Sequence, residues 1–255
     1  MPVPSRPTIL NLPRCPAVLP PVPSTDALDP VAYHEALAAD WDRRYQRGSF
    51  ARRACFFARK ILPLLPPAGH WLDAGCGTGT FSRMLAADNR TVLGVDASVA
   101  MVEEGRRLAE PLGGRAAFEP VATVERLPFP DASFDGVICL SVLEYLAKPQ
   151  AALDELARVL RPGGVVVVSV PHRHSAVRAL QRAMAAFRQP RQAGGVAYLA
   201  LSRFSVAPAA FAAMAADAGL TVSARLGFDP VVPGAMQVLV APSLLYFVCR
   251  KASVV

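Results

Sequence analysis

The stretch WLDAGCGTGT, residues 71–80, decides the fold of this 255-residue chain. An apolar segment ends in the acidic residue Asp73, and glycines then stand at every second position. Glycine has no Cβ, so it permits a sharp turn and a close approach of the backbone to a ligand. The helical spacing of Phe81, Met84 and Leu85 predicts a helix whose first N–H groups face that ligand. The stretch therefore indicates a strand, a nucleotide-binding loop and a helix.

Short apolar segments alternate with helical patterns on both sides of this loop. The run Val165–Val168 is apolar on both faces, as in a parallel sheet covered on both sides. The alternation predicts an α/β fold with a Rossmann-like, doubly wound sheet. The expected strands are 70–73, 91–96, 116–121, 134–140, 165–170, 221–227 and 243–250, and the expected helices are 80–87, 98–109, 150–160, 174–188 and 207–218.

The segments before this α/β region have a different character. Residues 1–25 contain eight prolines, which predicts a disordered tail over 1–28 ahead of a single domain over 29–255. Within 29–66 we expect two helices. The first runs from Pro30 to Tyr45, because aromatic and leucine side chains recur there every four residues, and the second covers about 50–65.

A second acidic residue, Asp96, ends the next expected strand about twenty residues past the glycine loop. A carboxylate there can accept both hydroxyls of a ribose. Dinucleotide loops usually read GxGxxG, whereas this loop reads GxGxG and follows Asp73. A diphosphate gains nothing from a nearby carboxylate, but a cationic ligand does. A nicotinamide-dependent oxidoreductase on a Rossmann fold remains the alternative.

The loop Asp73–Gly79 resembles the first motif of class I S-adenosylmethionine-dependent methyltransferases, and the match continues along the chain. It is closest to the ubiquinone/menaquinone-type branch, whose enzymes act on small molecules. The further segments that are similar to family motifs, in the family's order, are Gly94–Ser98 with Met101, Glu125–Asp135, Leu143–Tyr145 and Arg158–Gly164.

The resemblance implies a seven-stranded sheet with an antiparallel last strand and S-adenosylmethionine as cofactor. Asp73 would order the ammonium end of the cofactor, Asp96 would hold the ribose hydroxyls, and the glycines would let the backbone pass beside it. The cofactor-binding residues that it implies are Asp73, Gly75, Cys76, Gly77, Gly79, Asp96, Ala97, Met101, Thr123, Val124 and Leu140.

The chain departs from the family at several positions. Thr123 stands where many relatives have an aspartate that contacts the adenine, although the N–H of Val124 can still serve the ring. Some quinone-type enzymes bind a metal after the fourth strand. Here Ser141 and Tyr145 occupy the matching positions and only Glu144 is kept, so we expect no metal. The Asn-Pro-Pro-aromatic motif of nucleic-acid amino-methyltransferases is absent.

Catalytic candidates follow the fifth expected strand. His172 and His174 would lie near the transferred methyl group, and a histidine pKa near 6.5 suits a general base. A solvated turn is the alternative interpretation of this segment. Tyr145 and Glu144 are second choices. We interpret His34 as a surface residue of the first helix.

Charge is distributed unevenly. The net charge is +7, and residues 156–216 contain no Asp or Glu but eight arginines. Within 172–206 we expect a helical cap insertion, because 174–188 has a basic amphipathic pattern. It can cover an apolar or anionic substrate, touch an anionic membrane surface as a peripheral contact, or be a plain surface helix. Five cysteines without a CxxC pair, and no signal-peptide pattern, indicate the cytoplasm.

The expected function is methyl transfer from S-adenosylmethionine to an apolar small molecule, with O-methylation favoured. C-methylation of a quinone or lipid-like substrate is the alternative within this class. An inactive cofactor-binding protein is a further possibility. A nucleic-acid methyltransferase is favoured only by the net charge, so no nucleic acid is expected. The stretch 230–249 has no charged residue and is long enough to raise the question of a membrane span. Pro233, Gly234 and Pro242 interrupt it, and its last part is better interpreted as a buried strand.

Overall fold

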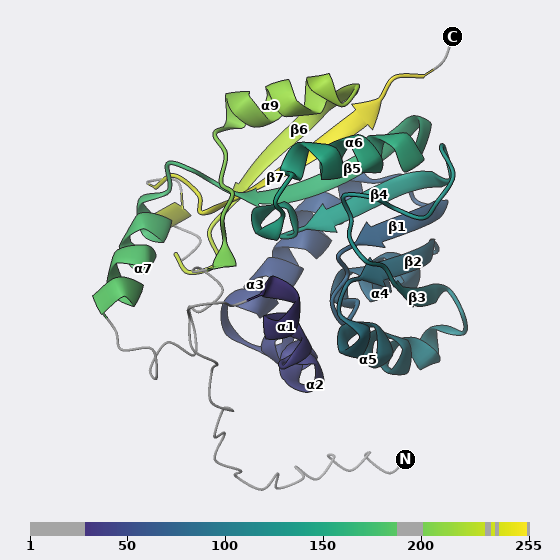
Figure 1. The fold of residues 1–255 in the computed structure, drawn as a ribbon, viewed down its shortest axis with the longest axis horizontal. Helices are drawn as coiled ribbons and strands as arrows, with labels where there is room; N and C mark the ends of the chain where they lie inside the picture. The colour runs from purple at the N-terminus through teal and green to yellow at the C-terminus, as the bar shows by residue number, and fades with distance from the viewer. Residues whose placement is uncertain (1–28, 188–200, 233–235, 238–239, 254–255) are drawn as a thin grey trace, which may run out of the picture.

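The computed structural model describes residues 29–187, 201–232, 236–237 and 240–253 (Figure 1). The tail predicted over 1–28 and the middle of the predicted cap, 188–200, lie outside the described residues. Among the helices of the described ranges, none has the length and apolar character needed to cross a membrane.

A seven-stranded sheet forms the centre of the fold, with the strand order β3-β2-β1-β4-β5-β7-β6 (Figure 1). The first five strands pair in parallel, and β7 runs antiparallel to both of its neighbours. The predicted Rossmann-like sheet with an antiparallel last strand is therefore confirmed. The strands are β1 (His70–Ala74), β2 (Thr91–Asp96), β3 (Ala116–Pro120), β4 (Phe134–Leu140), β5 (Leu160–Pro171), β6 (Leu220–Phe228) and β7 (Leu244–Lys251).

Helices cover both faces of this sheet. On one face α6 (Pro149–Val159) and α9 (Pro208–Asp217) pack over Val166 and Val168 of β5. On the other face α3 (Gly48–Phe56), α4 (Thr80–Ala87) and α5 (Val99–Ala109) share a core with Val165 and Val167. All four valines are fully buried, which explains the unbroken apolar run. Figure 1 shows α6 and α9 in front of the sheet and α4 behind it.

Strand β5 begins five residues earlier than the predicted start at Val165. Phe134 pairs with Leu160, and the register then shifts so that Gly136 pairs with Val165. Gly163 has a φ of 77°, a left-handed conformation that glycine adopts without strain. The segment 161–164 is thus a bulge within the strand, whereas the strand expected from the sequence begins only after it, at Val165.

The predicted continuous helix from Pro30 to Tyr45 is wrong. The segment forms α1 (Pro30–Glu35), α2 (Ala38–Trp41) and the 3₁₀ turn η2 (Asp42–Gln46). Tight i→i−3 hydrogen bonds separate them: the Leu37 N–H donates to the carbonyl of His34, and the Asp40 N–H donates to that of Leu37. At this break α1 docks on α5. The Glu35 carboxylate accepts hydrogen bonds from the Ser98 hydroxyl and from the Ala100 N–H at the start of α5.

The second N-terminal helix also ends irregularly. After α3 the chain makes one π turn, η3 (Phe57–Ile61), and the 3₁₀ turn η4 (Leu62–Leu64) before β1. Phe57 and Ile61 are fully buried against the sheet. Two further 3₁₀ turns, η5 (Glu110–Leu112) and η6 (Leu143–Tyr145), follow α5 and β4. The last helix of the described residues before the gap at 188–200 is α7 (Ala176–Phe187).

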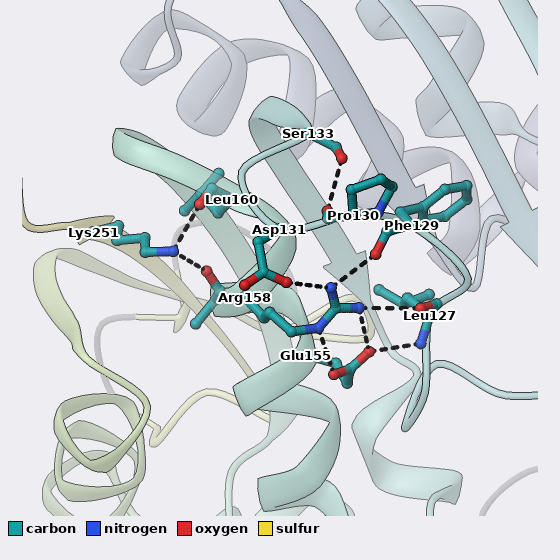
Figure 2. A network of polar contacts seen from close by, with 10 residues as sticks. Leu127, Phe129, Pro130, Asp131, Ser133, Glu155, Arg158, Leu160 and Lys251 are labelled. Atoms are coloured by element: carbon teal, nitrogen blue, oxygen red, sulfur yellow. Dashed lines mark hydrogen bonds and ion pairs between the residues drawn. The ribbon is translucent and has the colours of Figure 1, made fainter.

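Arg158, in the last turn of α6, holds the connection between β3 and β4 (Figure 2). Its guanidinium donates to Glu155 Oε1 (2.8 Å), to Asp131 Oδ1 (2.8 Å) and to the carbonyls of Phe129 (2.8 Å) and Leu127 (3.0 Å). A planar guanidinium can serve several acceptors at fixed angles, which an ammonium group cannot. Arg158 thus fixes the connection that also carries residues 122–124, part of the site described below.

We expect Arg158→Lys to lower the free energy of unfolding by about 1–3 kcal/mol, because the two carbonyls lose their donors. Urea denaturation measures the change. The control is Arg107→Lys, whose guanidinium pairs with Glu104 in solvent with a 63% exposed side chain. That change should cost less than about 0.5 kcal/mol. Equal losses in the two variants would contradict this role for Arg158.

Candidate functional site

A cavity of about 770 Å³ lies at the C-terminal ends of β1, β2 and β4, beneath the N-terminal helices. This volume falls in the range of roughly 300–1,000 Å³ that is usual for small-molecule sites. The strand ends supply Asp73, Asp96 and Leu140, and α1, α2 and α3 supply His34, Trp41, Phe50 and Arg53. The position matches the rule that ligands of parallel sheets bind beyond the carboxyl ends of the strands.

The glycine loop between β1 and α4 is held in left-handed backbone conformations. Gly75, Gly77 and Gly79 have φ values of 78°, 55° and 76°. A Cβ at Gly75 would lie 2.2 Å from Val142, and one at Gly79 would lie 2.2 Å from the Phe118 ring. A Cβ at Gly77 meets no atom closer than 3.4 Å. The outer glycines therefore satisfy packing, whereas Gly77 faces the cavity.

Asp96 ties this loop to the end of β2. Its Oδ2 accepts from the Gly77 N–H (2.8 Å), and its Oδ1 accepts from the Ser98 N–H (2.9 Å). A carboxylate offers about four acceptor positions, so each oxygen retains one for a further donor. The N–H groups of Gly75 and Cys76 donate to the Val95 carbonyl beside it. The carboxylate is thus oriented by the backbone and half-buried at the cavity wall.

Asp73 is a buried carboxyl group, with 2% of its surface exposed. Burial removes water from the charged form and raises the pKa of Asp73 to about 7. The Ser82 hydroxyl, which donates to Oδ2 at 2.6 Å, opposes that rise by stabilising the carboxylate. The group would gain from a cationic ligand, since nearby positive charge favours ionisation.

Arg53 supplies the opposite charge on the same side of the cavity. Its Nε donates to the Tyr246 hydroxyl (3.1 Å), its Nη2 donates to Ser169 Oγ (3.4 Å), and the guanidinium lies 5.3 Å from the Phe81 ring centroid. These partners are neutral, and no carboxylate of the described ranges lies within ion-pair distance of Arg53. Sequence reasoning missed this residue, since nothing in its helical context marks it as part of a site.

The structure places the predicted cofactor residues together, with one exception. Gly79 lies behind the loop, where it caps α4 and packs on Phe118. Thr123 reaches the cavity while its hydroxyl accepts from the Glu125 N–H at 3.1 Å. The predicted cofactor residues that line the cavity are Asp73, Gly75, Cys76, Gly77, Asp96, Ala97, Met101, Thr123, Val124 and Leu140.

The catalytic candidates are divided. Tyr145 lines the large cavity, whereas His172 lines a smaller one, where its Nδ1 lies 3.1 Å from the Pro242 carbonyl oxygen. His174 is exposed and lines neither cavity. The interpretation of His34 as a surface residue is wrong, because this side chain lines the large cavity and is half-buried. Its Nδ1 lies 2.7 Å from the Pro30 carbonyl oxygen one turn earlier in α1.

Glu144, the other second-choice candidate, is buried and hydrogen-bonded to the segments that follow β5. Its carboxylate is 3% exposed and accepts from the Ser202 hydroxyl (2.8 Å) and from Arg178 Nη2 (3.3 Å) of α7. Its carbonyl accepts from the N–H groups of Arg203 (2.8 Å) and Phe204 (3.2 Å). Glu144 therefore holds the described parts of the predicted cap, α7 and 201–206, against the cavity. Within the described ranges, no three His, Cys, Asp or Glu side chains gather as a metal site.

Comparison with known proteins agrees with this geometry. Residues 72–168 match the family described as Methyltransferase domain. The chain is 45% identical over 98 residues to a demethylmenaquinone methyltransferase of Clavibacter sepedonicus, covering 38% of this chain and 39% of that protein. It is 39% identical over 105 residues to a malonyl-(acyl-carrier protein) O-methyltransferase of Serratia marcescens, covering 40% and 38%. The chain thus spans about two fifths of the length of these relatives.

The likeness in structure extends over more of the chain. The magnesium protoporphyrin IX methyltransferase of Synechocystis, solved with bound S-adenosylhomocysteine, superimposes with a TM-score of 0.65 at 18% identity, covering 87% of this chain and 98% of that one. At this identity the match shows a shared fold. The family match identifies residues 72–168 as a methyltransferase domain, for which S-adenosylmethionine is the cofactor, and the glycine loop and the oriented Asp96 lie within it.

Proposed function

We propose that the protein transfers a methyl group from S-adenosylmethionine to an apolar small molecule, and that the favoured acceptor is an oxygen atom. One observation carries the proposal: a single cavity joins the residues suited to the donor with an apolar region suited to an acceptor. In this reaction the cofactor supplies a methyl group bonded to a positively charged sulfur, and the neutral thioether that leaves is a good leaving group. The protein's task is to align the acceptor and to exclude water.

Three features of the donor half of the cavity support binding of S-adenosylmethionine. Gly77 lines the cavity opposite Trp41 and carries no side chain that would obstruct a ligand, and the remaining acceptor positions of Asp96 suit two vicinal hydroxyls. Asp73 and Arg53 present one acidic and one basic group, which match the ammonium and the carboxylate of an amino acid. The adenine would lie between the residues implied by the resemblance, Ala97, Met101, Thr123 and Val124.

The acceptor half combines apolar and aromatic side chains with the arginines Arg44, Arg178 and Arg203. Its described carboxylates are both engaged: Asp29 caps the N-terminus of α1, and Glu144 accepts from Ser202 and Arg178. Its side chains come from the N-terminal helices, from η6 and from the start of β7, and α7 closes one side. Such a wall favours an apolar acceptor and keeps water from the reacting atoms. The described apolar and aromatic residues of this half are Tyr45, Phe50, Tyr145, Leu146, Leu201 and Leu244.

Carbon methylation of a quinone or lipid-like substrate would use the same cavity, and a nicotinamide oxidoreductase would place a pyrophosphate beside Asp73. A fold shared by many chemistries cannot decide among these reactions. The full-length protein, incubated with methyl-labelled S-adenosylmethionine and a small-molecule extract, should yield a labelled product. Mass spectrometry then gives the acceptor atom. Binding of NAD without binding of S-adenosylmethionine would contradict the proposal.

Asp96→Asn should lower the affinity for S-adenosylhomocysteine by about 30-fold, since the side-chain amide offers one neutral acceptor oxygen in place of two charged ones. The 2′-deoxy analogue sharpens the test: it should bind the unchanged protein about tenfold less tightly and Asp96→Asn with little further loss. Calorimetric titration measures each value. Asp154→Asn, on the exposed side of α6, is the matched control and should change binding less than about twofold. Full additivity of the two changes would contradict ribose binding at Asp96.

Asp73→Asn should stabilise the ligand-free protein at pH 8 and lower its affinity for S-adenosylhomocysteine. The unfolded chain releases the Asp73 proton near pH 3.9, whereas the folded protein keeps it to about pH 7. The folded state therefore binds more protons in this window, and stability falls as the pH rises from about 4 to 7. An amide avoids this cost and still accepts from Ser82.

The measurement is the Tm between pH 4.5 and pH 8. Asp73→Asn should gain several degrees over the unchanged protein at pH 8 and little at pH 4.5. Ser82→Ala serves as the matched variant, because loss of its hydrogen bond to the carboxylate should destabilise more at pH 8 than at pH 4.5. A lower Tm of Asp73→Asn at pH 8 would show that Asp73 is ionised in the folded protein without cost.

A further inference from the structure

His34 lies in the last turn of α1, at the junction of the donor and acceptor halves of the cavity. Its ring makes edge contacts with three aromatic rings, at centroid distances of 5.2 Å to Tyr33, 5.1 Å to Trp41 and 5.4 Å to Tyr145. Trp41 approaches Gly77 of the donor loop, and Tyr145 follows the end of β4. These contacts hold the imidazole in one place between the two halves.

The hydrogen bonding of His34 determines its tautomer. Its Nδ1 lies 2.7 Å from the Pro30 carbonyl oxygen. A carbonyl oxygen can only accept, so Nδ1 carries the proton and Nε2 keeps its lone pair. In the part of the chain that the structure describes, no residue hydrogen-bonds Nε2. The ring is therefore positioned as a proton acceptor with its basic nitrogen still available.

The surroundings also keep the ring neutral near pH 7. Burial lowers the pKa of His34 below 6.5, since the charged form loses hydration. The Pro30 carbonyl, Asp96 and Glu144 oppose this by favouring the imidazolium, and Arg44 adds to the lowering. Burial has the largest effect, so the lone pair is available at neutral pH. The two carboxylates would still stabilise an imidazolium formed during a reaction.

We propose that Nε2 of His34 is the general base of this site and takes the proton of an acceptor hydroxyl. The inference rests on the proposed function. As the oxygen–methyl bond forms, the methyl–sulfur bond breaks and its electron pair remains on sulfur, leaving a neutral thioether. The hydroxyl proton passes to Nε2, and the imidazolium later loses it to solvent. His172 and His174 do not line this cavity and so do not contact the acceptor.

The first test is independent of any substrate. The chain has four histidines, so ¹⁵N NMR of the labelled full-length protein, with His34→Asn for assignment, resolves the His34 ring. The expected result is the Nδ1–H tautomer at pH 7.5 and a titration midpoint below 6.5. An Nε2–H tautomer, or a midpoint at or above 6.5, overturns the proposal.

The second test uses methyl transfer to the acceptor found by the labelling experiment, with kcat measured from pH 5.5 to pH 9. His34→Asn should lower kcat by about 10²–10⁴-fold and abolish the acidic limb of the profile. Its affinity for S-adenosylhomocysteine should change less than about threefold, because Asn can still donate to the Pro30 carbonyl. The control is His70→Asn, at the exposed start of β1 outside the cavity, which should keep the profile.

The two proposals fail in different ways. If His34→Asn keeps both its rate and the acidic limb, the role of His34 is wrong while methyl transfer stands. If no acceptor is labelled although the cofactor binds, the proposed function fails. An unchanged rate in His34→Asn with a methylated carbon in the product would equally remove the need for this base.

Discussion

The carboxylate of Asp96 is the contact on which the site depends. One oxygen receives the Gly77 N–H of the loop after β1, and the other receives the Ser98 N–H at the start of α5. Three glycines with left-handed backbones would otherwise be costly to order, because glycine loses more conformational freedom than any other residue. The carboxylate fixes the loop, and the loop in turn orients the carboxylate toward the cavity.

The N-terminal helices complete what the sheet begins. The Glu35 carboxylate joins α1 to the start of α5, so the segment that carries His34 and Trp41 is attached two residues from Asp96. Arg53 reaches from α3 to Tyr246 and Ser169 of the sheet. The N-terminal helices are therefore joined to α5 and to the sheet by polar contacts at a few points.

The strands and helices of the α/β region could be predicted closely, because local patterns determine them. Examples are the doubly apolar run Val165–Val168 and the glycine loop. The cofactor side of the cavity followed from the same motifs. The break after α1 could not be predicted, since it accompanies docking of Glu35 on a distant helix and no glycine or proline marks it. His34 lies on the helix that this docking holds, whereas Arg53 is placed by its own contacts with Tyr246 and Ser169 of the sheet.

The predicted catalytic histidines after β5 lie away from the large cavity. Their position just past the end of a strand favoured a catalytic role. In the structure, however, the backbone after β5 bonds to Ser243, ahead of β7, and to Val206. The His172 N–H donates to the Ser243 carbonyl, and the His172 Nδ1 lies near the Pro242 carbonyl oxygen, so the ring points to the smaller cavity.

A crystal structure with S-adenosylhomocysteine tests the account most directly. The account predicts both ribose hydroxyls on Asp96 and the sulfur facing His34 and Tyr145. A nucleoside bound away from Asp96, or a sulfur pointing away from His34, would contradict it.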